Sequence, residues 1–596
     1  LRLSRGELAV IYCMACVGSL LSGTGLVHRL LPGMVTNHFM YAEPGTWYYP
    51  FLKYIPAWFG PAAADPGAVD EFFAPTGAGV PWGAWLLPLA AWSVLICSLF
   101  FAMLCVVILL RRQWTETENL NFPIAQLPLA LIGGEAAGGA PGGLLRNRLT
   151  WTGFAVSALL LGYNGLTRYV QALTPVSLEL DFANFLVEKP WSAMTLETML
   201  PSDPFLFSVS PLMIGIAYLF PLNTLMSVWL FFLLTRLQLL GAELTGLSQM
   251  TAANRLMFFS GARQFPFFSS QAQGGIYVLI IFMVWSARSH LRELAGKAFR
   301  FRQGRPGREE GEPFSAGFTV WGLSGALGIC VIWAHMAGLG IGCGLAFFLL
   351  FLILALAFAR MRAEAGVPFT YELLPVPFLI YMATGTGPAI YSASDYQVLS
   401  HLNMLCAGGF GMLMVILFES FKMGQAAAVP APRMTLALVL AFALGLAIAF
   451  WTSLTAIYTH GLQDMGSGNQ YAAVSFYHGR EVNHTVHWAY KPQAAAWLNY
   501  AFEGIGFAVT AALAVLRRVF SHWPLHPIGF VVGTGFGYKL WSSVLIAWAI
   551  KSTMLRYGGV RLYQKALPAF LGLALGHLAM EMFWAVVALS LGSAGG

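Results

Sequence analysis

Long apolar runs alternate with short polar segments along the whole chain. About 20 apolar residues are enough to cross the hydrocarbon core of a bilayer, so each such run predicts a transmembrane helix. The predicted helices cover residues 6–31, 83–110, 149–173, 205–220, 222–240, 272–290, 315–338, 340–360, 404–423, 433–458, 497–517 and 567–593.

Three further apolar segments, 121–134, 372–392 and 524–552, are interrupted by proline and glycine. These predict half-helices or re-entrant hairpins, because broken backbone at membrane depth must be packed in protein or line a polar cavity. The pattern therefore predicts an all-α fold, a polytopic transmembrane bundle. We expect about 14–16 membrane segments, broken helices included.

Composition supports the membrane class, since 58% of the 596 residues are hydrophobic and 10% are charged. A globular domain has about a quarter charged residues. The net charge of +7 does not indicate nucleic acid, because the basic residues flank apolar runs. The positive-inside rule explains that placement, so membrane lipids are the expected surroundings and nucleic acid is not an expected partner.

Charge also orients the chain. Arg2 and Arg5 precede the first helix, which predicts a cytoplasmic N-terminus. Loops 32–82 and 174–204 are acidic and are expected outside. This orientation requires 205–220 and 222–240 to cross separately at Pro221. The domain division expected is an N-terminal transmembrane half (1–290), a basic cytoplasmic loop (291–314) and a C-terminal transmembrane half (315–596), with 459–496 as an extracytoplasmic loop.

Two similar polar stretches follow apolar helices. One is RRQWTETENLNFPIAQLP at Arg111–Pro128 and the other is RMRAEAGVPFTYELLP at Arg360–Pro375. In each, arginines are followed by acidic residues and then by two prolines. This predicts a parallel duplication with a site between two related halves. The arginines have a simpler interpretation as helix-end groups at the interface. The candidate site residues in the two stretches are Glu116, Glu118, Glu364, Tyr371 and Glu372.

A few other ionisable residues lie within apolar segments, where they usually face a cavity or a partner. Glu503 lies inside 497–517, and His577 and Glu581 lie four residues apart in the last predicted helix. That spacing places the last two on one helix face, where a carboxylate beside an imidazole suits proton transfer. The alternative for this pair is a structural interhelical hydrogen bond.

Metal and cofactor chemistry have little support in the sequence. His484 and His487 form an H-x-x-H pair in the loop 459–496, but a zinc site needs further ligands close by. The glycines of 523–543 lack the G-K-[ST] of a phosphate loop. We therefore expect no metal and no cofactor. No serine, cysteine or aspartate constellation argues for hydrolysis, so we do not expect an enzyme.

Several segments resemble a prokaryotic membrane family of unknown function, itself similar to the oligopeptide transporter superfamily. They are GELAVIYCMACVGSLLSGTGL, ENLNFPIAQLP, RAEAGVP, HPIGF, LIAWAIKSTMLRYGG and LPAFLGLALG. The resemblance implies about 16 membrane segments with re-entrant hairpins and proton-coupled uptake of peptides or metal chelates. NFPIAQLP matches an apolar-Phe-Pro motif entering a pore hairpin, with Ile124 and Ala125 replacing the usual serine and glycine. The residues implied to line the path are Asn121, Phe122, Pro123 and Gln126.

These observations predict a secondary active transporter, driven by protons, for oligopeptides or a similar small polar solute or metal chelate. Its expected location is a prokaryotic inner membrane, and a homo-oligomer is left open. The alternatives are a non-transporting subunit of a membrane assembly and an intramembrane enzyme acting on lipid-linked substrate. Broken helices and sparse carboxylates in a chain without a soluble domain favour the transporter.

Overall fold

The computed structural model is helical except for one two-stranded sheet among the residues it describes. Nine of the described helices are long and apolar enough to cross a membrane, which is compatible with an integral membrane protein. The all-α class is thus confirmed, and the full count of segments stays a prediction. The described residues are 3–23, 25–40, 49–77, 79–133, 143–170, 172–195, 205–249, 265–302, 311–368, 376–407, 409–463, 488–492, 497–520, 522–537 and 540–590.

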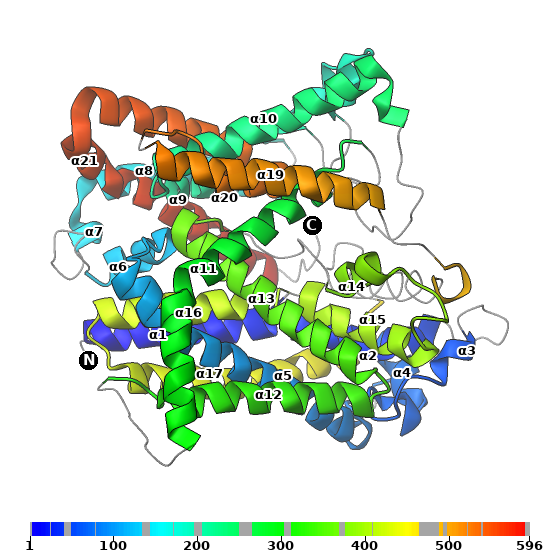
Figure 1. The fold of residues 1–596 in the computed structure, drawn as a ribbon. Coiled ribbons are helices and arrows are strands. Elements are labelled where there is room, and N and C mark those ends of the chain that lie inside the picture. Colours follow the sequence, from blue (N-terminus) through cyan, green and yellow to red (C-terminus); the bar gives the residue numbers. More distant parts are fainter. Residues whose placement is uncertain are drawn as a thin grey trace.

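The helices form two bundles (Figure 1). In the first bundle α1 packs on α17, α5 packs on α12, and α16 contacts α1, α5 and α13. Buried aromatic side chains fill it, among them Trp85, Trp92 and Phe72. Its helices are α1 (Arg5–Ser22), α2 (Val27–Met40), α4 (Gly67–Phe73), α5 (Trp82–Arg112), α12 (Ala316–Met336), α13 (Ile341–Ala365), α14 (Val376–Thr384), α15 (Ala393–Ala407), α16 (Met412–Ala426) and α17 (Ala431–His460).

The second bundle lies above the first in Figure 1. Here α8 and α9 pack on α21, α10 and α11 pack on α20, and α11 packs on α19. α11 also contacts α12 and α13 and so joins the two bundles. The helices of the second bundle are α8 (Arg148–Leu166), α9 (Pro211–Ala217), α10 (Leu222–Thr245), α11 (Phe268–Arg302), α19 (Trp497–Val519), α20 (Pro527–Phe536) and α21 (Trp541–Ser590).

Shorter elements connect these helices. The strands β1 (Glu179–Asp181) and β2 (Leu206–Ser208) pair antiparallel. The short helices are α3 (Tyr49–Leu52), η1 (Pro61–Ala63), η2 (Gln113–Thr117), η3 (Pro123–Ala125), α6 (Gln126–Leu131), α7 (Gly143–Arg146), η5 (Phe182–Asn184), η6 (Trp191–Thr195) and η7 (Leu247–Gln249).

Two helices predicted as continuous are interrupted. The run 6–31 divides into α1 and α2, and the run 404–423 divides into the end of α15 and α16. Glycines lie at both interruptions. A Cβ on Gly25 would overlap the carbonyl of Leu20, and Gly409 has φ 73°, a left-handed conformation that glycine adopts readily.

The helix predicted over 205–220 is wrong. That segment contains the strand β2 and then α9, which has seven residues. Ser210 caps α9 and Pro211 occupies its first position, so the helix begins there and not earlier. Phe205 packs on Phe232 within α10, whereas Phe220 lies just before Leu222, where α10 begins. Separate crossings at Pro221 stay a prediction.

Two other boundaries also differ from the predictions. Residues 291–302, expected in a loop, continue α11 to Arg302. The apolar segments 524–552 and 567–593 are α20 and the long helix α21, which kinks at Gly559, with φ 62° and ψ −165°.

Each bundle also combines helices from 1–290 with helices from 315–596. The two parts of the chain are therefore interleaved in space.

Two helix crossings of the second bundle have the same construction. In the α8–α21 crossing, a Cβ on Gly153 would overlap the Ala569 carbonyl and one on Gly572 would overlap that of Thr150. In the α19–α11 crossing, Gly506 faces Gln271 and Gly274 faces Glu503 in the same way. In all four cases the carbonyl belongs to the residue three before the partner glycine. Small residues of this kind let helix backbones touch.

The half-helices α9 and α20 also correspond. Each begins with a capping residue and then proline, Ser210–Pro211 and His526–Pro527. The Ser210 backbone N–H donates to the Ser543 hydroxyl at 2.9 Å. The His526 backbone N–H donates to the Ser227 hydroxyl at 2.7 Å. Ser227 lies in α10, after α9, and Ser543 lies in α21, after α20. α9 is thus held by α21, which follows α20, and α20 is held by α10, which follows α9.

Candidate functional site

The two stretches singled out in the sequence meet in space. The backbone N–H of Phe122 donates to the carbonyl of Ala363 at 2.9 Å. η3, which follows Phe122, packs against α13 and α16. The segments that leave α5 and α13 therefore form one layer at a common end of the first bundle. The two stretches are therefore in direct contact.

The backbone after α5 is irregular. α5 passes into a π-helical turn, η2, and then a loop in which Asn119 has φ 48° and Phe122 has φ 43°. A bulky residue such as Phe122 rarely adopts a left-handed conformation, so the surrounding contacts must hold it there. Its side chain is buried, with the Lys422 ammonium 5.9 Å from the ring centroid. Irregular backbone of this kind often marks functional sites.

Arg360, near the C-terminal end of α13, connects the carboxylates of both stretches. Its guanidinium pairs with Glu118 and also with Glu364, at 3.2 Å. The Arg360 side chain is 18% exposed and lies over the Trp114 ring. Glu118 in turn accepts a hydrogen bond from Ser286 of α11 at 3.1 Å. Arg360 therefore links the first bundle to a helix of the second.

Glu364 extends this network into the second bundle. Its Oε1 lies 3.4 Å from Nε2 of His526 and 3.6 Å from a guanidinium nitrogen of Arg517. Arg517 also contacts the His526 ring. We call Glu118, Arg360, Glu364, Arg517 and His526 the ion cluster. Two carboxylates and two arginines balance in charge, so the protonation state of His526 sets the net charge of the group.

His526 is held from several sides and is 1% exposed. Nδ1 accepts a hydrogen bond from the Ile528 backbone N–H at 3.1 Å and so caps α20. Nε2, the other ring nitrogen, faces both the Glu364 carboxylate and the Arg517 guanidinium. Burial lowers the pKa of His526, Glu364 raises it and Arg517 lowers it, so the neutral ring is favoured relative to a free histidine.

Neighbouring ion pairs brace the same end of the first bundle. Arg362 forms a forked pair with Glu419, at 2.7 and 3.1 Å. Arg111 and Arg112 both pair with Glu312, at 2.8 and 2.6 Å. Forked arginine–carboxylate pairs fix geometry as well as charge. These ion pairs join α5 to the segment before α12 and α13 to α16.

The other residues predicted along the first stretch lie beside the ion cluster. Glu116 is exposed and is not part of the cluster. Asn121 is exposed as well, and its carbonyl accepts a hydrogen bond from the Gln126 side chain at 3.3 Å. Pro123 is buried at the start of η3. The segment that follows Phe122 is thus a short helical turn leading into α6.

The remaining predicted residues are separate from the cluster. Glu503 is 7% exposed in α19, and its Oε1 has no hydrogen-bond partner among the described residues. Glu503 lies at the glycine crossing of α19 with α11. Its carboxylate is near enough to the hydroxyl groups of Tyr277 and Tyr500 to interact with them electrostatically.

His577 and Glu581 share one face of α21, as predicted, and form a hydrogen bond of 3.0 Å. The Glu581 side chain is 63% exposed. Two further predicted residues, Tyr371 and Glu372, lie outside the described residues.

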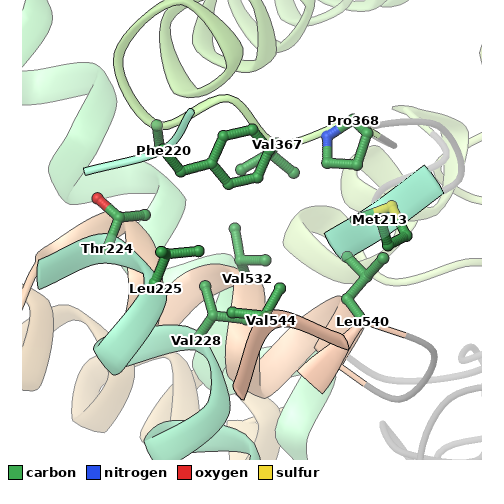
Figure 2. A pocket seen from close by; sticks show the side chains of 11 residues that line it. Met213, Phe220, Thr224, Leu225, Val228, Val367, Pro368, Val532, Leu540 and Val544 are labelled. Carbon is green, nitrogen blue, oxygen red and sulfur yellow. The ribbon is translucent and has the colours of Figure 1, made fainter. Parts of the chain in front are cut away.

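A small apolar cavity of about 20 Å³ lies next to the ion cluster, between α9 and α10 on one side and α20 and α21 on the other. This is room for roughly one water molecule. Figure 2 shows side chains from α10, α20 and α21 pointing toward one another beneath the chain that follows α13. The lining residues are Met213, Phe220, Thr224, Leu225, Val228, Ala365, Val367, Pro368, Val532, Leu540 and Val544.

The described residues contain no group of three or more His, Cys, Asp or Glu side chains that could hold a metal ion. His484 and His487, considered as metal ligands, lie outside the described ranges. The ion cluster itself offers ion pairing and, at His526, proton binding.

Sequence reasoning missed Ser286, Arg517 and His526. His526 lies between two prolines in a segment recognised only as broken, and Arg517 ends a helix like many interfacial arginines. The sequence did contain one useful signal. Gly153–Ala158 reads GFAVSA and Gly506–Ala511 reads GFAVTA, and these are the segments that make the two glycine crossings.

The helices and the ion cluster define an all-α protein with spans of membrane length and a charged contact between two bundles. The chain belongs to the family of unknown function DUF6785, whose model matches residues 1–595. No curated protein matches the chain.

Proposed function

We propose that this protein is a proton-coupled secondary active transporter. The observation that carries the proposal is the pair of corresponding half-helices, α9 and α20, on either side of one cavity. Half-helices facing each other across a central site are a recurrent construction in transporters. We place the chain in a prokaryotic inner membrane, with the N-terminus in the cytoplasm, from its charge pattern and its family resemblance.

An internal duplication supports this function. We infer that α8–α11 and α19–α21 are two copies of one unit, because both the GFAV-containing helices and the half-helix contacts correspond. α10 and the first part of α21 correspond and run antiparallel, since Phe232 stacks on Trp541 while Trp229 meets Trp548. A two-fold axis relating antiparallel membrane helices lies in the membrane plane. The two copies therefore have inverted topology.

Inverted repeats provide a physical route to alternating access. When two copies adopt slightly different conformations, exchanging those conformations opens the site to the opposite side of the membrane. Val228 and Val544 occupy corresponding places, one residue after Ser227 and Ser543, and both line the cavity. The cavity thus lies between the two copies. Its small volume fits a closed state of such a transporter.

The substrate class in this proposal is a small polar solute, an oligopeptide or a metal chelate. The resemblance to the oligopeptide transporter superfamily supports it, together with the irregular backbone at Phe122. The parallel duplication expected from 111–128 and 360–375 involves other segments than the inverted one. It stays a prediction.

The proposal is tested by transport in proteoliposomes. Purified protein is reconstituted with a pH-sensitive dye inside, a pH gradient is imposed, and di- to tetrapeptides and metal chelates are added in turn. The expected result is a proton flux that depends on one class of substrate. Val228→Trp, which fills the cavity, should abolish this flux, whereas the exposed Leu436→Trp should not. Folded protein that moves no proton with any compound would favour the non-transporting subunit.

A further inference from the structure

The two inferred copies differ in the residue that caps their half-helix. Ser210 and His526 are corresponding caps, each followed by proline and each fixed by a serine of the other copy. Ser210 caps α9 with its hydroxyl, which accepts from the Met213 N–H. His526 caps α20 with its imidazole. A titratable side chain therefore replaces a non-titratable one at one of two equivalent positions.

His526 also lies where the two bundles meet. Glu364, which faces its Nε2, belongs to α13 of the first bundle, and Arg360 joins Glu364 to Glu118. Arg517, which contacts the same Nε2, belongs to α19 of the second bundle. α10 contributes the uncharged Ser227. These are the charged and polar groups that the described elements bring against the ring.

We propose that His526 is a proton-binding switch that couples protonation to the contact between the two bundles. This inference rests on the proposed transporter function and deepens it, because it assigns one proton-binding step to a residue.

Protonation of His526 has two direct consequences. Both ring nitrogens of an imidazolium carry protons, so Nδ1 can then no longer accept the Ile528 N–H. α20 loses its cap, because Pro527 has no N–H and Ile528 carries the first backbone donor of this helix. The imidazolium also adds a positive charge next to both Glu364 and Arg517. Attraction to Glu364 and repulsion from Arg517 then rearrange the contact.

A proton from solvent can reach the ring through the partly exposed Glu364 carboxylate. His526 is buried, but the side chains of Arg517 and Glu364 are 40% and 29% exposed. The pKa of His526 is lowered, first by burial. Protonation therefore needs acid or a rearrangement that brings the ring nearer to Glu364. This dependence on conformation is what coupling of a proton to a movement requires.

The test uses the full chain in lipid nanodiscs and measures the separation of the bundles without any substrate. Spin labels are placed on Leu436 of α17 and Val519 of α19, which are both exposed, and their distance is recorded by pulsed electron resonance. Between about pH 8 and about pH 5 the distance distribution should shift, because this range spans the titration of histidine. His526→Ser should abolish the shift while keeping a cap of the kind found at Ser210.

His526→Ser that retains the full shift would overturn the inference, as would a parent chain without any shift. Glu364→Gln is the second variant, and it should move the midpoint of the shift to lower pH by removing the attracting carboxylate. If Glu364→Gln loses the distance shift and His526→Ser keeps it, the proton binds at Glu364 and not at His526. Transport is measured separately, so a chain with this shift but no transport loses only the proposed function.

Discussion

Phe122 donates its backbone N–H to the carbonyl of Ala363, at 2.9 Å, and so joins the segments that leave α5 and α13. The bond brings Glu118 and Arg360 within reach of each other, although they are 242 positions apart in the numbering of the chain. Through Glu364 the same arginine continues to His526 in the second bundle. The charged groups at the ends of two membrane helices thus form one connected contact between bundles.

Removing the guanidinium of Arg360 should destabilise the protein. Arg360→Gln leaves Glu118 and Glu364 without their shared cation, and hydrogen bonds to charged groups contribute about 1.5–3 kcal/mol each. We expect a lower midpoint of thermal unfolding in detergent. Arg433→Gln is the matched control, because Arg433 is exposed at the start of α17 and should change stability by no more than about 0.5 kcal/mol. Equal midpoints for both variants would contradict the account.

The two similar glycine crossings predict that an added methyl group destabilises the protein equally in α8 and in α19. Gly153→Ala and Gly506→Ala each place a methyl group against a carbonyl of the facing helix. Overpacking of this kind costs about 1–3 kcal/mol. Gly504→Ala is the control on the same helix as Gly506, since nothing lies within 4 Å of its added Cβ. Thermal unfolding of the three variants measures the effect, and a tolerated Gly506→Ala would refute the close crossing.

The stability of the protein should fall in mild acid because of His526. Its pKa is lower in the folded state, so the neutral ring stabilises the fold above the ordinary histidine pKa of about 6.5. As the pH falls below that value the unfolded chain binds the proton first, and this contribution is lost. His526→Ser should remove that part of the acid dependence. Unfolding midpoints between about pH 8 and about pH 5 measure it. Identical acid profiles would count against a buried neutral His526.

Glu503 should be required for coupled flux. Its buried Oε1 has no partner among the described residues, so an ionised carboxylate there is costly and a bound proton relieves that cost. Glu503→Gln keeps the shape of the side chain and removes the titration. We expect proton flux in proteoliposomes to fall at least about tenfold, the effect of about 1.4 kcal/mol. Glu581→Gln, on an exposed side chain, should retain most of the flux. Unchanged flux in Glu503→Gln would remove this residue from the mechanism.

Local pattern was sufficient for the class of fold and for part of the site. Apolar runs predicted the long helices, and carboxylates next to prolines pointed to Glu118 and Glu364. The helix predicted at 205–220 was wrong because hydropathy alone does not separate an extended segment from a helix. His526 could not be recognised locally, since its role depends on groups from α13, α19 and α10. The GFAVSA and GFAVTA match was the signal available for the two units that we infer to be inverted copies.

The central claim is alternating access to the site between α9 and α20, and cysteine accessibility tests it most directly. Val544→Cys places a thiol in the cavity of a chain whose native cysteines are replaced. A membrane-impermeant maleimide is applied to each side of oriented vesicles at about pH 8 and about pH 5, a range that spans histidine titration. The account predicts labelling from one side at one pH and from the opposite side at the other. Labelling from the same side under both conditions would contradict alternating access.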